Sequence, residues 1–375
     1  MTRLRVVVSG MVAADPDQGG ATWAVLQYIL GLRRLGHDVL FVEPVDVPSR
    51  GTVASFAATA LRFGLDGSAA LLERGSRRSW GLPREVVAAR CKKADVLINV
   101  SGLLREPELV EPIPIRVYLD LDPGFTQLWA EVEGIDMGFE GHTHFVTVGG
   151  RIGRPDCHVP TCGLNWTATL PPVVLDRWPV AERTSVDAFT TVANWRAYGS
   201  IQTRDRHFGQ KAHSIRRLIG LPRESGKTFA LALSIHPDER VDLDALRAHS
   251  WQLLDAKAFA GTPSRYHRFV QGSFAEIGIA KSGYVESACG WFSDRSACYL
   301  ASGRPVVAQE TGFGEQLPVG EGLLSFRDER EAVAATAAVT SSYPQHRRAA
   351  RRIAEEFLDS DRVLGSLLEQ VGGAA

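Results

Sequence analysis

Residues 290–331 read GWFSDRSACYLASGRPVVAQETGFGEQLPVGEGLLSFRDERE. The stretch begins with Gly290. Its pattern predicts a short helix that begins near Ser293 or Asp294, a turn at 302–305 and a buried strand at 306–308. A second glycine loop follows at 311–314, then Leu323-Leu324 and a helix. A strand that ends in a glycine loop beside a helix N-terminus leaves backbone N–H groups free to bind an anion. The stretch therefore predicts a phosphate-binding site.

Two segments of this stretch resemble a known family. ASGRPVV at 301–307 and GFGE at 312–315 are similar to the donor-binding half of GT-B-fold glycosyltransferases, in particular the bacterial, retaining, glycogen-synthase-like type. CGWFS at 289–293 resembles the corresponding Cys-Gly-Trp-Asn-Ser of plant natural-product transferases. The resemblance implies two facing Rossmann-like, doubly wound α/β domains with a cleft between them.

The activity implied by the resemblance is transfer of a sugar from a nucleotide-diphosphate sugar to an acceptor hydroxyl or amine. The nucleotide sugar is a co-substrate, and no metal or other cofactor is expected. The Ala-, Arg- and Gly-rich composition suits a bacterial enzyme of secondary metabolism or polysaccharide synthesis. Two alternatives remain open: an enzyme resembling nucleotide-sugar 2-epimerases, and a non-catalytic GT-B partner subunit.

The ribose-binding motif departs from the family pattern. Retaining members carry two glutamates with seven residues between them, and the spacing places Gly290 and Cys298 at these positions. The plant type expects His at Ala288 and Glu at Ser296. Asp294 and Glu286 are the candidate substitutes. The donor base and the stereochemistry of transfer stay open.

Length and charge bound the remaining possibilities. A chain of 375 residues suits two domains. The formal net charge is −1, so the composition indicates no general attraction to nucleic acid or to an anionic membrane. No apolar run is long enough for a membrane span, and no signal-peptide core is seen, so we expect a cytoplasmic protein, as monomer or homodimer.

Proline density marks the expected boundary between the domains. Residues 169–183 read as a linker. We therefore predict an acceptor-binding domain at 1–183, a donor-binding domain at 184–345, and C-terminal helices at 346–375 that pack back towards the first domain.

The five cysteines are scattered, unlike a disulfide framework. Cys157, His158 and Cys162 lie close together, but no second pair completes a four-ligand site. We expect thiols buried in a loop, and no metal.

The first domain begins with a βαβ unit. A strand at 4–8 is followed by a small-residue loop, Gly19-Gly20, a helix that ends at Gly36, and a strand at 39–42. In the family this loop faces the donor phosphates and the acceptor. The alternative is that the two glycines only form a turn.

Candidate general bases follow later strands of this domain. The strand at 115–119 ends in Asp120-Leu121-Asp122-Pro123-Gly124, and ligands of parallel sheets bind beyond such carboxyl ends. Asp122 is the first candidate, unless it is only a turn residue. His142, His144 and Asp17 are further candidates. A retaining enzyme requires no base at this position.

The second domain begins with a strand at 188–195. By order in the chain, Arg196 and Lys211 match the basic residues that hold the donor diphosphate in the family, unless they are ordinary surface charges. Either Lys281 or Arg295 could add a cation. The remaining predicted donor contacts are the nucleotide-binding Ser293, Asp294, Arg295 and Ser296, and the sugar-binding Thr311, Gly312, Phe313, Gly314 and Glu315.

Overall fold

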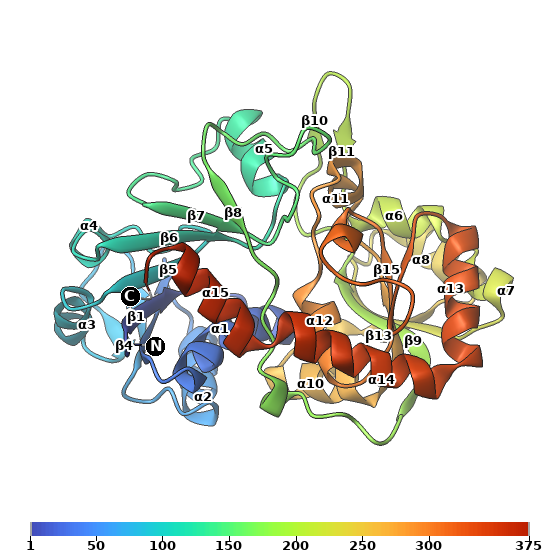
Figure 1. The fold of residues 1–375 in the computed structure, drawn as a ribbon, viewed down its shortest axis with the longest axis horizontal. Helices are drawn as coiled ribbons and strands as arrows, with labels where there is room; N and C mark the ends of the chain where they lie inside the picture. The colour runs from blue at the N-terminus through green and yellow to red at the C-terminus, as the bar shows by residue number, and fades with distance from the viewer. Residues whose placement is uncertain (1, 374–375) are drawn as a thin grey trace.

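Two β-sheets organise the protein, which a computed structural model describes over residues 2–373 (Figure 1). The sheet of the N-terminal domain has the order β4-β3-β2-β1-β5-β6-β7-β8, and only β3 and β4 are antiparallel. Its strands are β1 (Arg5–Ser9), β2 (Asp38–Val45), β3 (Ala69–Glu73), β4 (Ser79–Gly81), β5 (Val96–Val100), β6 (Ile115–Asp120), β7 (His144–Thr147) and β8 (Trp166–Ala168). Its helices are α1 (Gly19–Arg34), α2 (Arg50–Arg62), α3 (Arg84–Cys91), α4 (Pro107–Val110) and α5 (Phe125–Glu131).

The sheet of the C-terminal domain is parallel throughout, in the order β13-β12-β9-β14-β15-β16. Its strands are β9 (Val186–Asn194), β12 (Phe229–Ser234), β13 (Gln252–Asp255), β14 (Ser273–Gly278), β15 (Val306–Gln309) and β16 (Leu323–Phe326), beside the hairpin β10 (Ile201–Gln202) and β11 (His207–Phe208). Its helices are α6 (Lys211–Arg217), α7 (Leu221–Ser225), α8 (Arg240–Ala248), α9 (Ala256–Ala260), α10 (Pro263–Gly272), α11 (Ser282–Ser287), α12 (Asp294–Ala301) and α13 (Glu329–Ser341).

Both sheets are doubly wound, as the sequence predicts. In each sheet the chain starts at a central strand and then builds outward in both directions, so the switch points lie beside β1 and β9. The strands are apolar runs because helices cover both faces of a parallel sheet. Ligands of such sheets bind beyond the carboxyl ends at the switch point. The two switch points therefore position the site.

Residues 48–85 are rich in Ala, Arg and Gly and are predicted from the sequence to form helices and loops, but the structure also has two strands there. In 48–85 the structure forms β3 and β4, and β3 pairs with β2 over Phe41–Val45. The segment AALLE is short and its alanines carry no strand preference, so its conformation depends on pairing with β2.

The connection between the domains is packed rather than loose. Val173 donates its N–H to the carbonyl of Leu358 at 2.7 Å, and Ser360 donates to the carbonyl of Val173 at 3.0 Å. Trp178 is fully buried, with its ring 4.9 Å from that of Trp23. The segment predicted as a linker therefore pairs with the C-terminal crossing of the chain.

The C-terminal helices α14 (Tyr343–Ile353) and α15 (Ser360–Gln370) are joined by a π-helical turn, and α15 lies along α1 (Figure 1). Asp359 caps α15 through the N–H of Asp361, and Asp361 pairs with Arg34 of α1 at 2.9 Å. Residues 374 and 375 of the predicted 346–375 segment lie outside the described part of the chain.

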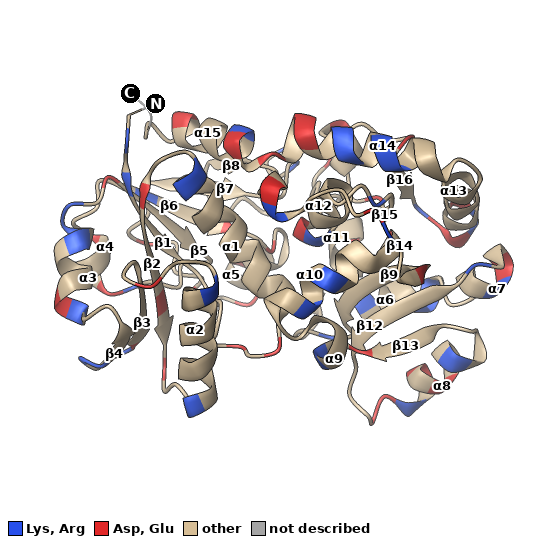
Figure 2. Cartoon of the chain, turned by 90° about the horizontal axis from the view of Figure 1, so that it is seen from below, with Lys and Arg blue, Asp and Glu red and all other residues tan. Residues whose placement is uncertain are grey.

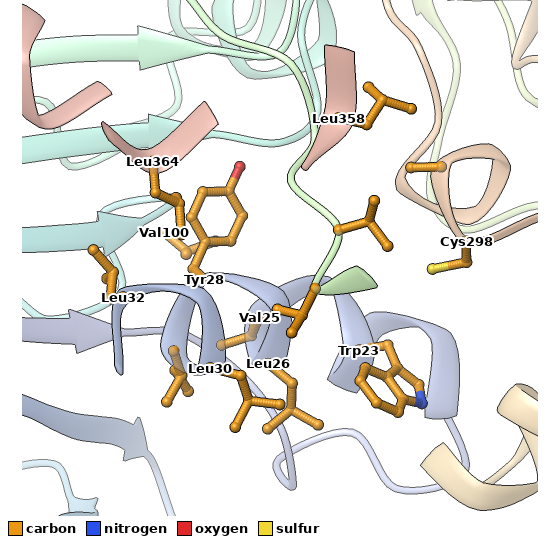
Figure 3. Packing of buried hydrophobic residues seen from close by; sticks show 14 of the residues in the cluster. Trp23, Val25, Leu26, Tyr28, Leu30, Leu32, Val100, Cys298, Leu358 and Leu364 are labelled. Carbon is orange, nitrogen blue, oxygen red and sulfur yellow. The ribbon is translucent and has the colours of Figure 1, made fainter. Parts of the chain in front are cut away.

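Helix α1 is buried on most of its sides and joins the cores of the two domains (Figure 3). Trp23, Leu26 and Leu30 lie in a continuous apolar cluster with Cys298 of α12 and Leu364 of α15. An apolar interface of this kind holds the sheets at a defined distance. Within residues 2–373 no helix combines the length and the apolar character needed to cross a bilayer.

Candidate active site

A cleft of about 660 Å³ lies between the carboxyl ends of the two sheets. The N-terminal domain contributes the loop after β1, the first turn of α1, and residues that follow β5 and β6. The C-terminal domain contributes the ends of β9 and β12, the start of α6, the segment after β14, and the start of α12. The volume is within the range of small-molecule sites.

A buried carboxylate fixes the loop after β1. Glu43 of β2 accepts the N–H groups of Ala13 and Ala14 at 3.0 and 2.7 Å. Burial raises the pKa of Glu43, and these hydrogen bonds oppose the shift. The loop thus leads into Gly19 and Gly20, which both line the cleft as the sequence predicts.

Asp122 also lines the cleft, and it is bound to the other domain. Its carboxylate accepts from the ammonium of Lys281 at 2.9 and 3.0 Å and from the hydroxyls of Tyr198 and Tyr284, both at 2.5 Å. The Lys281 ammonium also lies 4.9, 4.2 and 5.0 Å from the ring centroids of Phe125, Tyr198 and Tyr284. Burial lowers the pKa of Lys281, and Asp122 opposes this shift.

Two more cations line the C-terminal side of the cleft. Lys211, the first residue of α6, is buried and donates to the carbonyl of Ile279 at 2.6 Å. Burial, together with repulsion from Arg295 and Lys281, lowers the pKa of Lys211 well below its ordinary value. Arg295 is paired with the fully buried Glu276 at 2.6 Å. Burial opposes the charge of Arg295, but Glu276 outweighs it and raises the pKa of the guanidinium.

The start of α12 has the predicted form. Ser293 is the N-cap and accepts the N–H of Arg295 at 3.2 Å, and the next residue, Asp294, lines the cleft. Burial raises the pKa of Asp294. The alternative ribose partner Glu286 pairs with Arg206 at 2.7 Å and is not among the lining residues of the cleft. Of the two predicted substitutes, Asp294 is the one placed in the site.

Arg196 and Ser296 lie outside the cleft lining, so the structure does not bring them together with Lys211 and Arg295, and their donor contacts stay predictions. Arg196 turns away after β9 and pairs with Glu239 at 2.6 Å, while Tyr198 enters the cleft. Ser296 is buried in α12 and lines a small void beside Phe313. The prediction for Arg196 rests on its order in the chain, and this order does not predict the direction of a loop side chain, which depends on local backbone turns.

The predicted bases other than Asp122 are placed differently from one another. His142 precedes β7 and therefore lies near its amino end; its ring contacts the amide of Asn99 at 3.0 Å and the carbonyl of Phe139 at 3.2 Å, outside the cleft lining. His144 contacts the hydroxyl of Thr143. Asp17 does line the cleft, paired with Lys257 at 2.7 Å.

The glycine loop predicted to contact the donor sugar instead contacts the N-terminal domain. Thr311 donates to the carbonyl of Trp291 at 2.5 Å, and Gly312 donates to Glu310 at 2.6 Å. Glu315 pairs with Arg151 at 3.1 Å and with Arg154 at 2.6 Å. None of the five residues Thr311, Gly312, Phe313, Gly314 and Glu315 lines the cleft between the sheets.

Several residues that line the cleft were missed in the sequence. Asn194 ends β9 and Ser234 ends β12, so the rule that ligands bind at the carboxyl ends of strands could have found both. Tyr198 and Tyr284 carry no comparable signal, because they enter the cleft only through packing against Phe125 of α5 at the domain interface. Trp291 lies in the CGWFS segment at 289–293, where no contact by this side chain is predicted from the sequence.

A metal-binding arrangement is not found in the described range, 2–373, where no three His, Cys, Asp or Glu side chains are grouped to hold an ion. Cys157 and Cys162 are half-buried free thiols, and burial raises the pKa of each, to about 11 for Cys162.

Comparisons with known proteins identify the fold. No protein-family model and no curated protein matches the sequence. Among solved structures, an alpha-glucosyltransferase in complex with UDP and a 13-mer DNA containing a HMU base matches with a TM-score of 0.65 at 11% identity, over 99% of this chain and 100% of that one. Sucrose-phosphate synthase from Thermosynechococcus elongatus gives 0.57 at 11% identity over 99% of both chains. AviGT4, a glycosyltransferase involved in avilamycin A biosynthesis, gives 0.53 at 14% identity over 98% and 97%.

The chain therefore has the GT-B fold, with two Rossmann-like domains that face each other across a cleft. The fold predicted from the sequence is confirmed. At these identities the similarity establishes architecture, and the chemistry has to be argued from the cleft itself.

Proposed function

We propose that this protein is a glycosyltransferase that moves a sugar from a nucleotide-diphosphate sugar to an acceptor hydroxyl or amine. The observation that carries the proposal is the set of cations on one side of the cleft: Lys211, Lys281 and Arg295 all come from the C-terminal domain and line the same space. Cations converging at the carboxyl ends of a parallel sheet suit a diphosphate. The GT-B fold supports the same assignment.

The transfer makes a specific demand on these cations. The bond between the anomeric carbon and the diphosphate oxygen breaks, and its electron pair leaves with the diphosphate, while the acceptor oxygen or nitrogen bonds to the carbon and loses a proton. Negative charge therefore grows on the leaving group, and preorganised positive charge stabilises it. Lys211 and Arg295 are held by Ile279 and Glu276 before any ligand binds. In an inverting enzyme Asp122 takes the proton.

The other half of the cleft favours a small acceptor without a net negative charge. Among the described residues, those that line the cleft from the N-terminal domain include no Lys or Arg. They are mostly small or apolar, and the charged ones are carboxylates: Met11, Asp15, Asp17, Gln18, Gly19, Gly20, Ala21, Ala24, Val25, Val100, Ser101, Leu103, Leu121 and Asp122. Nucleic acid requires cations against its phosphates.

The surface charges agree with this acceptor class. Lys and Arg are interspersed with Asp and Glu along the elements of both domains (Figure 2), and the formal net charge of the chain is only −1. The five cysteines are free thiols, which suits the reducing cytoplasm. A small acceptor in the cytoplasm fits bacterial secondary metabolism or the early steps of polysaccharide synthesis.

A thermal-shift experiment tests the donor site with UDP, TDP, GDP, ADP and CDP against the purified protein. A ligand at about a hundred times its dissociation constant stabilises the native state by roughly 2.7 kcal/mol, and each kcal/mol raises the melting temperature of a domain of this size by about 2–4 °C. We expect one diphosphate to raise it by several degrees, and its monophosphate to do less. No shift with any of the five would contradict the proposal and favour the non-catalytic subunit.

A further inference from the structure

Lys281 lies between Asp122 and the space that the donor diphosphate is proposed to occupy. On one side its ammonium binds both oxygens of Asp122, at 2.9 and 3.0 Å, across the domain boundary. On the other side it lines the same cleft as Lys211 and Arg295, and Lys211 donates to the carbonyl of Ile279, two residues before Lys281, at 2.6 Å. A diphosphate neutralised by Lys211 and Arg295 would therefore lie within electrostatic reach of Lys281.

Asp122 is the carboxylate that pairs with Lys281, and the aromatic groups around the ammonium are uncharged. Besides binding Asp122, the ammonium donates a hydrogen bond to the Tyr198 hydroxyl, the aromatic rings of Phe125, Tyr198 and Tyr284 cover it, and its side chain is only 16% exposed. A cation–π contact attracts an ammonium from several directions, so the rings restrain its position weakly compared with a charge-assisted hydrogen bond. A second anion in the cleft could therefore draw it away from Asp122.

The Asp122 carboxylate is fully occupied in this arrangement. Oδ1 accepts from Lys281 and Tyr284, and Oδ2 accepts from Lys281 and Tyr198. A carboxylate offers about four acceptor positions, and all are used. A general base must reach the proton that it takes, so Asp122 cannot receive an acceptor hydroxyl while Lys281 remains bound.

We propose that the donor diphosphate and Asp122 compete for Lys281, so that donor binding releases Asp122 to the acceptor side and makes the donor bind first. This inference rests on the function proposed above. It makes Lys281 a positioning residue that couples the two substrate sites, and it gives Asp122 a reason to be paired in the structure without ligands.

The two possible roles of Asp122, competitor of the diphosphate and structural bridge between the domains, predict opposite changes in nucleotide affinity when its charge is removed. If Asp122 only holds the two domains together, removal of its charge opens the cleft and weakens nucleotide binding. If it competes with the diphosphate, part of the donor's binding free energy is used to separate Lys281 from Asp122, and removal of the charge returns that free energy. The sign of the change in affinity therefore separates the two roles.

The test is a double-mutant cycle by isothermal titration calorimetry with UDP, or with the diphosphate that gives the largest thermal shift. We expect Asp122→Asn to tighten binding about fivefold, the low end of typical site-to-site coupling. Lys281→Met should weaken binding about tenfold through loss of a charged hydrogen bond. In the double variant, Asp122→Asn should have no further effect. Unchanged or weaker binding by Asp122→Asn would overturn the proposal.

Two controls make the result specific. Asp15→Asn removes the same charge from the cleft lining without breaking an ion pair of Lys281 or of Lys257, so it measures the long-range electrostatic effect alone. Tightening by Asp122→Asn that equals this effect, or that persists in Lys281→Met, also overturns the proposal. Tyr284→Phe removes one donor to Asp122 and should strengthen its hold on Lys281, so UDP should bind more weakly.

These outcomes are distinct from failure of the proposed function. If no nucleoside diphosphate binds the wild-type protein, the donor site itself is absent. If UDP binds the wild type, and Asp122→Asn and Tyr284→Phe both leave its affinity unchanged, the donor site stands and the competition for Lys281 is refuted. Thermal melts of each variant establish that it is folded before titration.

Discussion

Gly19 of α1 lies so close to Thr262 that a Cβ on the glycine would stand 2.4 Å from the Thr262 carbonyl oxygen. The carbonyl of Ala260 would be 2.5 Å away. Both contacts are with backbone atoms of the other domain, which cannot rotate aside. The glycine at the start of α1 is therefore required by the approach of the two domains, at the same place where the cleft begins.

We predict that Gly19→Ala separates the domains, lowers the free energy of unfolding by about 1–3 kcal/mol and weakens nucleotide binding, because overpacking displaces backbone. Urea denaturation and calorimetry measure the two effects. Gly51 in α2 is a matched control: a Cβ there meets only Ser49 Oγ at 3.5 Å, so Gly51→Ala should leave binding unchanged and stabilise the helix by up to about 1 kcal/mol. Wild-type stability and affinity in Gly19→Ala would contradict the role of this contact.

Lys211 should strengthen nucleotide binding and lower the stability of the protein in the absence of nucleotide. Because burial lowers its pKa in the folded state, the unfolded chain binds the proton more readily, and stability should rise with pH towards the ordinary lysine pKa of 10.5. We predict that Lys211→Met raises the melting temperature at pH 7, flattens this pH dependence, and removes the shift produced by the nucleotide. Thermal melts between pH 7 and 10 test all three.

The matched control for Lys211 is Arg196, which the sequence suggested as its partner. Arg196 pairs with Glu239 outside the cleft lining. Arg196→Ala should keep the nucleotide shift of the wild-type protein. A loss of the shift equal to that of Lys211→Met would place Arg196 in the site and would mean that the cleft rearranges when the donor binds.

The sequence predicts the sheets well because their strands are continuous apolar runs. Val6-Val7-Val8 and Val306-Val307-Ala308 lie in strands that have a neighbour on each side, where burial on both faces selects such residues. AALLE at β3 could not be predicted with the same means, since its strand conformation depends on pairing with β2, which is distant in the chain.

The sequence could predict which residues lie at strand ends within each domain, but not which residues of the two domains contact each other. Asp122 and Lys281 each follow a strand end, and the sequence points to both as candidates, but their contact depends on how the domains face each other. The position of the loop 311–315 could not be predicted for the same reason, because Glu315 is held by Arg151 and Arg154 of the other domain. No periodicity within one domain carries such information.

Asp294 provides a test of the divergent ribose motif. It lines the cleft at the first turn of α12, and the two positions where retaining family members carry glutamates are Gly290 and the buried Cys298. We predict that Asp294→Asn weakens UDP binding about tenfold, through loss of a charged hydrogen bond to the ribose, and leaves binding of inorganic pyrophosphate unchanged. Calorimetry with both ligands separates the ribose contact from the diphosphate contact.

Glu286→Gln is the control for Asp294, because Glu286 pairs with Arg206 away from the cleft lining. It should bind both ligands as the wild-type protein does. If Asp294→Asn weakens UDP and pyrophosphate equally, the effect comes from the electrostatics of the cleft, and Asp294 does not substitute for the missing ribose glutamate.

The pair of Glu276 and Arg295 should be the most costly one to break near the site. Glu276 is fully buried, and its distance to Arg295 is 2.6 Å. Removing one member leaves an unpaired buried charge, which typically costs about 3–5 kcal/mol. We predict a loss of this size in Glu276→Ala by urea denaturation, together with weaker UDP binding, because Arg295 also loses its position.

The exposed pair of Asp244 and Arg247 is the control: Asp244→Asn should change the free energy of unfolding by less than about 0.5 kcal/mol. Equal effects of the two substitutions would show that Arg295 is hydrated and does not need Glu276, and the preorganised cation at the donor site would then be Lys211 alone.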